Sequence, residues 1–194
     1  MNRLITLHNA IFDEIEKADG VIPLLARFVF AATLLNYFWV SALTKTGDGV
    51  LGLFKVTAGG FGQIFPKQAE SVLWDVSQMS VFQKVVVLAG TWAEFILPVL
   101  IVVGFATRLA SIGMIGFVVV QSLTDLYGHG GIAHGETLGA WFDKAPDGAI
   151  LDQRAFWIFV LLVLVIKGAG AVSVDRLLSW QVRGHAANQD TQQA

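Results

Sequence analysis

Four long apolar runs constrain the fold of this chain more than any other feature of its sequence. They cover residues 21–43, 84–103, 108–127 and 154–172. A helix of about 20 mostly apolar residues crosses the hydrocarbon core of a bilayer. Charged residues make up only 14% of the chain, against roughly 25% in soluble domains. The sequence therefore predicts an all-α integral membrane protein, folded as a four-transmembrane-helix bundle over residues 21–180.

The segments before and after this bundle have a different character. Leu4, Leu7, Ile11 and Ile15 recur at helical spacing and are separated by polar and acidic residues. Residues 1–20 are therefore expected to form an amphipathic interfacial helix on the membrane surface. A helix packed on a partner protein is the alternative. The polar tail, residues 181–194, is expected to be disordered.

Composition also excludes several classes of function. The chain has no cysteine, which excludes disulfides, thiolate-bound iron–sulfur clusters and covalently attached c-type haem. Its net charge of −2 gives no indication of nucleic acid as a partner. The first 20 residues lack the continuous apolar core of a cleavable signal, so the first span is expected to direct its own insertion.

The basic residues near the span ends indicate an orientation. Four spans place both termini on the same side of the membrane. Arg108 lies in the very short link between the second and third spans, and Arg176 follows the fourth span. Since short cytoplasmic loops are enriched in arginine and lysine, both termini are expected in the cytoplasm.

Ionisable residues inside the predicted spans are the first candidates for a functional site. Glu94 lies near the middle of the second span, Arg27 interrupts the first and Lys167 lies in the fourth. At ~1.5 Å per helical residue, both cations are expected just below the acid and within reach of it. An intramembrane charge is costly unless it is paired, and such residues are often functional. Glu94, Arg27 and Lys167 are therefore the candidate catalytic residues, and a structural ion network is the alternative.

Polar side chains form a second predicted layer. Asn36 and Gln121 are expected at a similar depth, where they could bind a cofactor or form hydrogen bonds between helices. Trp92 comes just before Ala93 and Glu94 in the second span and completes the candidate cofactor-binding set. Gly113 and Gly116 are expected to allow close approach of a neighbouring helix.

A further candidate site follows the third span. Asp125, His129, His134 and Glu136 lie close together in sequence, and imidazole and carboxylate groups bind zinc, iron, copper or manganese. These four residues are the candidate metal ligands. The alternative is a hydrogen-bonded loop that covers the end of the bundle.

Three sequence stretches together resemble the DoxX family of small four-span bacterial membrane proteins. They are LLARFVFAATLLNYFWVSALTK, AEFILPVLIVVGFATRLASIGM and FVLLVLVIKGAGAVSVDRL. The resemblance covers roughly residues 22–180 apart from the two long loops. The positions that match the family pattern are Arg27, Glu94, Arg108, Gly168, Gly170 and Asp175.

The resemblance implies a bacterial inner-membrane protein associated with a redox system, since relatives include the DoxD subunit of thiosulfate:quinone oxidoreductase. A quinone could lie against Arg27, Glu94 and Trp92, with Glu94 as proton donor or acceptor. The expected protein partners are subunits of a redox complex or further copies of this chain in a homo-oligomer. Two alternatives remain open: a permease for a small molecule or an ion, and a non-catalytic assembly or anchoring subunit.

Overall fold

A computed structural model describes residues 2–181, and these residues contain helices and loops but no β-strand. Four helical stretches in this range are long and apolar enough to cross a membrane. The predicted four-helix membrane bundle is thus confirmed, and the chain is a multi-pass membrane protein. The spans are Val21–Leu43, Val81–Val103, Thr107–Gly128 and Ala149–Lys167. Of the predicted disordered tail, all but Gln181 lies outside the described residues.

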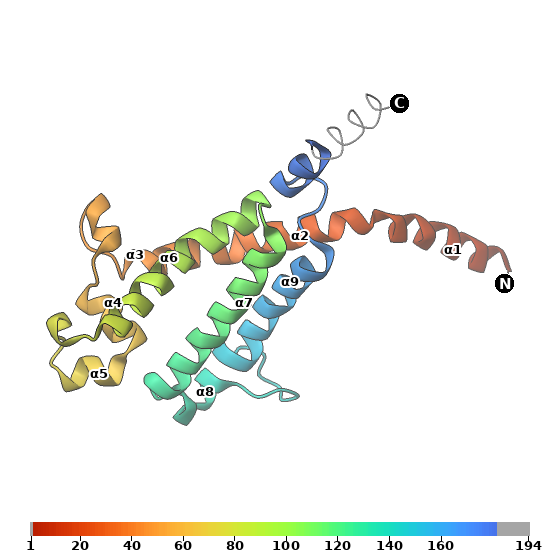
Figure 1. The fold of residues 1–194 in the computed structure, drawn as a ribbon. Coiled ribbons are helices and arrows are strands. Elements are labelled where there is room, and N and C mark those ends of the chain that lie inside the picture. Colours follow the sequence, from red (N-terminus) through yellow and green to blue (C-terminus); the bar gives the residue numbers. More distant parts are fainter. Residues whose placement is uncertain (1, 182–194) are drawn as a thin grey trace.

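The first span contains two α-helices joined by a π-helical turn. Helix α2 is Val21–Phe30, the turn is Ala31–Leu35 and helix α3 is Asn36–Leu43. Helix α1, Asn2–Lys17, precedes them and extends away from the bundle (Figure 1). The predicted N-terminal helix is therefore present, while its place on a membrane surface stays a prediction.

Helices α6 and α7 form a hairpin at the centre of the fold. Helix α6, Val81–Val103, and helix α7, Thr107–Leu123, are joined by a tight turn and spread apart from it (Figure 1). Helix α9, Arg154–Lys167, packs along α7, and α3 packs along α6. Buried apolar side chains fill the bundle between these helices and α2. They are Ala26, Phe30, Leu34, Phe38, Ile101, Ala110, Met114, Val118, Leu161 and Leu164.

Three spans differ from the predicted boundaries, the third of them by only one residue at each end. Helix α6 begins three residues earlier than expected, because Ser80 and Gln83 form a reciprocal capping box at its start. Helix α9 ends at Lys167 rather than continuing to residue 172. Gly168 and Gly170 both have φ of +80°, a left-handed backbone that cannot continue a right-handed helix.

The long segment after the first span folds into short helices against the bundle. Helix α4 is Ala58–Ile64 and helix α5 is Pro66–Ser71. Phe61 and Ala69 from these helices are buried together with Val87 of α6. Helix α4 therefore covers the early turns of α6, at the end of the bundle away from both termini (Figure 1). We call this end the loop face and the opposite end the terminal face.

The second long loop lies at the same end of the bundle. A π-helical turn, Thr124–Gly128, extends α7, and the short helix α8 is Gly135–Leu138. Another π-helical turn, Ala149–Gln153, leads into α9. Both long loops therefore lie at the loop face (Figure 1), and they touch where a Cβ on Gly128 would lie 3.1 Å from Pro66.

Candidate functional site

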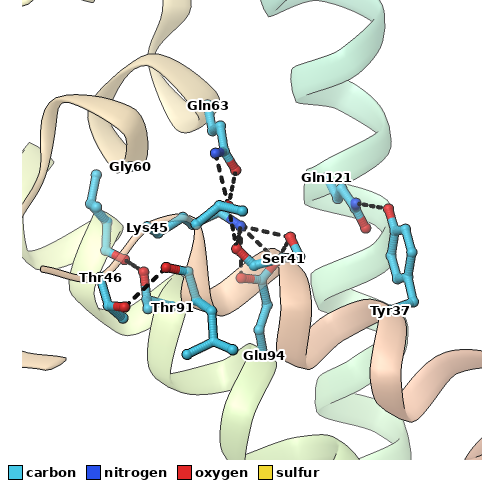
Figure 2. Close-up of polar contacts among 12 residues, drawn as sticks. Tyr37, Ser41, Lys45, Thr46, Gly60, Gln63, Thr91, Glu94 and Gln121 are labelled. Atoms are coloured by element: carbon cyan, nitrogen blue, oxygen red, sulfur yellow. Dashed lines mark hydrogen bonds and ion pairs between the residues drawn. The ribbon is translucent and has the colours of Figure 1, made fainter. Parts of the chain in front are cut away.

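A buried ion pair forms the centre of the candidate site. The ammonium Nζ of Lys45 lies 2.8 Å from Oε2 of Glu94 and 3.1 Å from Oε1. Ser41 Oγ donates to the same carboxylate at 2.9 Å. Relative exposure is only 6% for Lys45 and 2% for Glu94. Figure 2 shows the three side chains converging from α3, the residues just after it, and α6.

The local fold explains how Lys45 reaches this position. Helix α3 ends at Leu43, and Lys45 Nζ turns back to the carbonyl of Ser41 at 3.0 Å. Thr57 caps the start of α4 through the amide of Gly60 and also donates to the carbonyl of Lys45 at 2.9 Å. A Cβ on Gly60 would lie 3.3 Å from that carbonyl and 3.1 Å from Val87. The glycine-rich start of α4 therefore fits closely around the backbone of Lys45.

The ion pair lies beside the last turn of the first span. Trp39 Nε1 donates to the carbonyl of Phe95 at 3.3 Å, which aligns the end of α3 with the middle of α6. Glu94 is therefore central within its own helix but close to the loop-face end of the neighbouring α3. The early turns of α6 continue past this level and are flanked by α4.

A cavity of about 460 Å³ opens between α6 and α7 and includes the ion pair in its wall. Ala89, Gly90 and Ala93 on α6 face Gly113 and Gly116 on α7 across it. The further lining residues are Ser41, Lys45, Gln63, Ile64, Val86, Glu94, Leu97, Phe117, Val120, Gln121, Thr124, Asp125 and His129. The walls are thus largely apolar, with polar groups concentrated toward the loop face.

The predicted close approach at the two glycines holds for only one of them. A Cβ on Gly113 would lie 3.3 Å from Leu97, whereas a Cβ on Gly116 would meet nothing within 4 Å. The missing side chain of Gly116 therefore leaves open space in the cavity instead of admitting a neighbouring helix.

Gln63 connects both sides of the cavity at the loop face. Its side-chain amide donates to Thr44 Oγ1 at 3.0 Å, and its backbone carbonyl lies 3.0 Å from Nε2 of His129. Because a carbonyl can only accept, Nε2 of His129 carries the hydrogen in this contact. The chain from Thr44 through Gln63 to His129 therefore links the end of α3 to the end of the third span.

The predicted cofactor-binding set is not assembled. Gln121 lines the cavity and its Nε2 donates to the hydroxyl of Tyr37 at 2.9 Å. Asn36 precedes Tyr37 and so lies at a depth similar to that of Gln121, as predicted, but it is exposed and does not line the cavity, so the two do not form one site. Trp92 also lies outside the cavity lining and packs on Phe54, with ring centroids 5.3 Å apart. Asn36 and Trp92 lie on other sides of their helices than the residues that line the cavity, so their side chains point elsewhere.

The predicted pairing of Glu94 with Arg27 is also wrong. The Arg27 guanidinium donates to backbone carbonyls, including those of Ile101 at 3.1 Å and Ala169 at 3.0 Å. It donates further to the carbonyls of Val102 and Val172. Arg27 thus satisfies the free carbonyls at the C-terminal end of α6 and in the loop after α9.

Asp175 completes this arrangement at the terminal face. Its carboxylate accepts hydrogen bonds from the amides of Ala106 at 2.7 Å and Thr107 at 3.0 Å, at the start of α7. Burial alone would raise the pKa of Asp175. The hydrogen bonds from Thr107 and Ala106 and the nearby charge of Arg27 together lower it by more than burial raises it. The net pKa lies below its ordinary value. Two of the residues that match the family pattern, Arg27 and Asp175, therefore hold helix ends together.

Lys167 likewise does not contact Glu94. Its Nζ lies 2.7 Å from Oδ1 of Asp19, and both side chains are well exposed at the terminal face. Of the three candidate catalytic residues, Glu94 alone lies in the cavity wall. Arg27 and Lys167 lie near the terminal face of the bundle, whereas Glu94 is level with the loop-face end of α3.

The four candidate metal ligands are divided between two places. Asp125 and His129 line the cavity, whereas His134 Nδ1 lies 3.7 Å from Glu136 in an exposed pair. Asp125 is instead paired with Arg154, which also donates to Ser122 Oγ at 2.9 Å. Across residues 2–181, no three His, Asp or Glu side chains come together as a metal site. The predicted four-ligand cluster is therefore wrong, since Arg154 engages Asp125 and the glycines after Tyr127 redirect the loop.

Lys45, Ser41 and Gln63 are site residues that the sequence did not reveal. Lys45 follows the end of a span, where lysine is common, and is 49 residues from Glu94 in the chain. The capping threonine and paired glycines of TAGG, which hold the Lys45 backbone, were the available signal. They indicate a helix start packed tightly on a neighbour.

No family model, curated protein or solved structure matches this chain. The resemblance to the DoxX family therefore remains a prediction. The chain is a multi-pass membrane protein with a buried Lys45–Glu94 pair in the wall of an apolar cavity.

Proposed function

We propose that this chain is a DoxX-like bacterial inner-membrane protein that binds a quinone between α6 and α7 and serves as a subunit or accessory of a quinone-linked redox system. The observation that carries the proposal is a largely apolar intramembrane cavity with the buried Lys45–Glu94 pair in its wall. Ligand cavities of this kind combine apolar walls with a few polar groups that orient the ligand.

The size and walls of the cavity suit an amphipathic ligand. About 460 Å³ lies within the range of roughly 300–1,000 Å³ found for small-molecule sites. The space beside Gly116 gives an isoprenoid chain an apolar surface to lie on. Since α6 and α7 spread apart from their shared turn (Figure 1), a ligand could enter between them from the lipid.

The polar wall suits a quinone head group. Lys45 Nζ has three hydrogens and four oxygens within 3.1 Å, two from Glu94 and two from Ser41. One acceptor can therefore be exchanged for a quinone carbonyl oxygen without leaving a hydrogen unpaired. Reducing a quinone to a quinol takes up two electrons and two protons. Glu94 and Lys45 are positioned to exchange those protons, and a partner redox subunit would supply the electrons.

The positions of the polar groups favour binding over passage through the protein. Ser41, Lys45, Glu94, Gln63 and His129 all lie toward the loop face. On the terminal side, buried apolar side chains fill the bundle and Arg27 is engaged by backbone carbonyls. This arrangement supports a one-ended binding site more than a continuous polar path for a permease.

Native mass spectrometry of the protein extracted gently from its own membranes tests the proposal. We expect a bound quinone, and we expect Gly116→Leu to remove it by filling the cavity. Gly135→Leu is the matched control, because a Cβ there also meets nothing within 4 Å but lies outside the cavity. The proposal fails if the extracted protein holds no quinone and respiration is unchanged when the protein is deleted.

A further inference from the structure

The two ends of the cavity differ in polarity, and this difference indicates the side from which protons reach it. We propose that water and protons reach Lys45 and Glu94 from the loop face alone, through a mouth beside Gln63 and His129. This inference concerns the cavity of the proposed function, but its test does not require the ligand to be a quinone.

The terminal end of the cavity is blocked by apolar packing. The lining extends toward the terminal face only as far as Leu97 and Gly113. Beyond them lie Ile101, Ala110 and Leu164, all buried in the apolar cluster. Further on, Arg27 is held by the carbonyls at the end of α6. Water crossing this layer would lose its hydrogen bonds without replacement, which is costly in an apolar interior.

The loop-face end is polar and reaches solvent. His129 is exposed and also lines the cavity, so one side chain joins the interior to the water outside. Gln63 lies next to it and is half-buried. Glu94 needs no path through the terminal half of the bundle, because it lies level with the last turn of α3.

His129 has the chemistry needed at such a mouth. Its Nε2–H donates to the carbonyl of Gln63, which leaves Nδ1 of the neutral ring as the proton acceptor. The ring thus offers one donor and one acceptor nitrogen at the point where the cavity meets the water outside. A proton taken up at Nδ1 can then be passed inward by water along the polar wall.

The other charged groups that line the cavity do not prevent this transfer. They are Lys45 after α3, Glu94 on α6, and Asp125 at the end of the third span. Lys45 and Glu94 neutralise one another, and Asp125 is paired with Arg154. The lining therefore has little net charge, and a proton that arrives at His129 meets no strong repulsion on its way inward.

Because the chain has no cysteine, single cysteines can report which face reaches the cavity. Ala93→Cys places a thiol in the cavity wall beside Glu94. Ser71→Cys marks the loop face and Asp13→Cys marks the terminal face, since both residues are exposed. Each variant is treated with a membrane-impermeant methanethiosulfonate in right-side-out and in inverted vesicles.

We expect Ala93→Cys to be labelled in the same vesicles as Ser71→Cys and not in those that label Asp13→Cys. Adding His129→Trp should slow the labelling of Ala93→Cys several-fold, while His134→Trp, at an exposed position outside the cavity, should not. Labelling from the Asp13 side, from both sides or from neither overturns the inference. Labelling that His129→Trp leaves unchanged overturns the location of the mouth.

The same variant separates this inference from the proposed function. Decylubiquinone should protect Ala93→Cys from the reagent if the cavity binds quinone. Loop-face labelling without protection would support the access route and count against quinone as the ligand. Protection combined with labelling from the terminal face would do the reverse.

Discussion

The ammonium of Lys45 lies 2.8 Å from the carboxylate of Glu94, and the two side chains are among the most buried charged groups of the protein. Ser41 adds a hydrogen bond to the carboxylate at 2.9 Å. A buried charge is tolerated when it is paired and hydrogen-bonded, but it becomes strongly destabilising when its partner is removed.

Glu94→Gln should therefore destabilise the protein by about 3–5 kcal/mol, the usual cost of leaving a buried charge unpaired. Lys45→Met in addition should recover part of that loss, because no uncompensated ammonium remains. Thermal unfolding of both single variants and the double variant in detergent measures this coupling. Additive losses in the double variant would contradict it.

The pair between Asp19 and Lys167 provides the matched control. It has a similar N–O distance of 2.7 Å but is well exposed. Exposed ion pairs contribute about 0–1 kcal/mol. Asp19→Asn should therefore change the unfolding temperature far less than Glu94→Gln. Equal losses would show that burial does not set the strength of the Lys45–Glu94 interaction.

Arg27→Met should reduce stability without removing the ligand. Arg27 holds backbone carbonyls of α6 and of the loop after α9, and it lies outside the cavity lining. The fraction that stays folded should keep the quinone content of the unaltered protein. Native mass spectrometry and thermal unfolding of the same sample check both parts, and quinone loss from well-folded Arg27→Met would place Arg27 in the site.

Gly104→Ala should disrupt the turn between α6 and α7. Gly104 has φ of +72°, and an added Cβ would lie 2.6 Å from Ser173 and 2.9 Å from the Arg27 guanidinium. The left-handed backbone alone costs a residue with a side chain about 1–2 kcal/mol, and the overpacking adds to this. Gly116→Ala, with open space and an ordinary helical backbone, is the control for thermal unfolding. Equal stability of the two variants would contradict this account of the turn.

Asp175 should make stability depend on pH under acidic conditions. Its pKa in the folded protein lies below the ordinary value of 3.8, so folding favours the charged carboxylate. The resulting stabilisation is fully present above that value and is lost as the pH falls through the lower, folded pKa. Asp175→Asn should lack this acid-dependent loss. Unfolding temperatures of both proteins from neutral to strongly acidic pH test this, and parallel curves would contradict it.

The sequence predicted the spans well because apolar length is a local property of the chain. It predicted the site poorly because the contacts of the site are not local. Arg27 binds backbone carbonyls. Because every residue has a backbone carbonyl, no residue type in the sequence marks these acceptors. Lys45 comes after the end of a span, and the TAGG segment that holds its backbone does not indicate that its side chain folds back to Glu94. Estimating the depth of each residue from its position in its helix also requires that all spans begin and end at the same levels. The Trp39–Phe95 hydrogen bond instead aligns the end of α3 with the middle of α6.

The metal prediction shows a related limit. Asp125 and His129 are spaced as on successive turns of a helix, and both do line the cavity. The sequence could not show that Arg154, from another span, pairs with Asp125. It also could not show that the glycines after Tyr127 carry His134 away to an exposed position.

Photolabelling with an azido-quinone tests the central claim most directly. In membranes that contain the intact protein, we predict labelled residues on the facing sides of α6 and α7, around Ala93 and Phe117, and loss of this labelling in Gly116→Leu. Labelling spread over exposed apolar residues outside the cavity, such as Ile96 and Val119, that Gly116→Leu leaves unchanged would contradict a quinone site in the cavity.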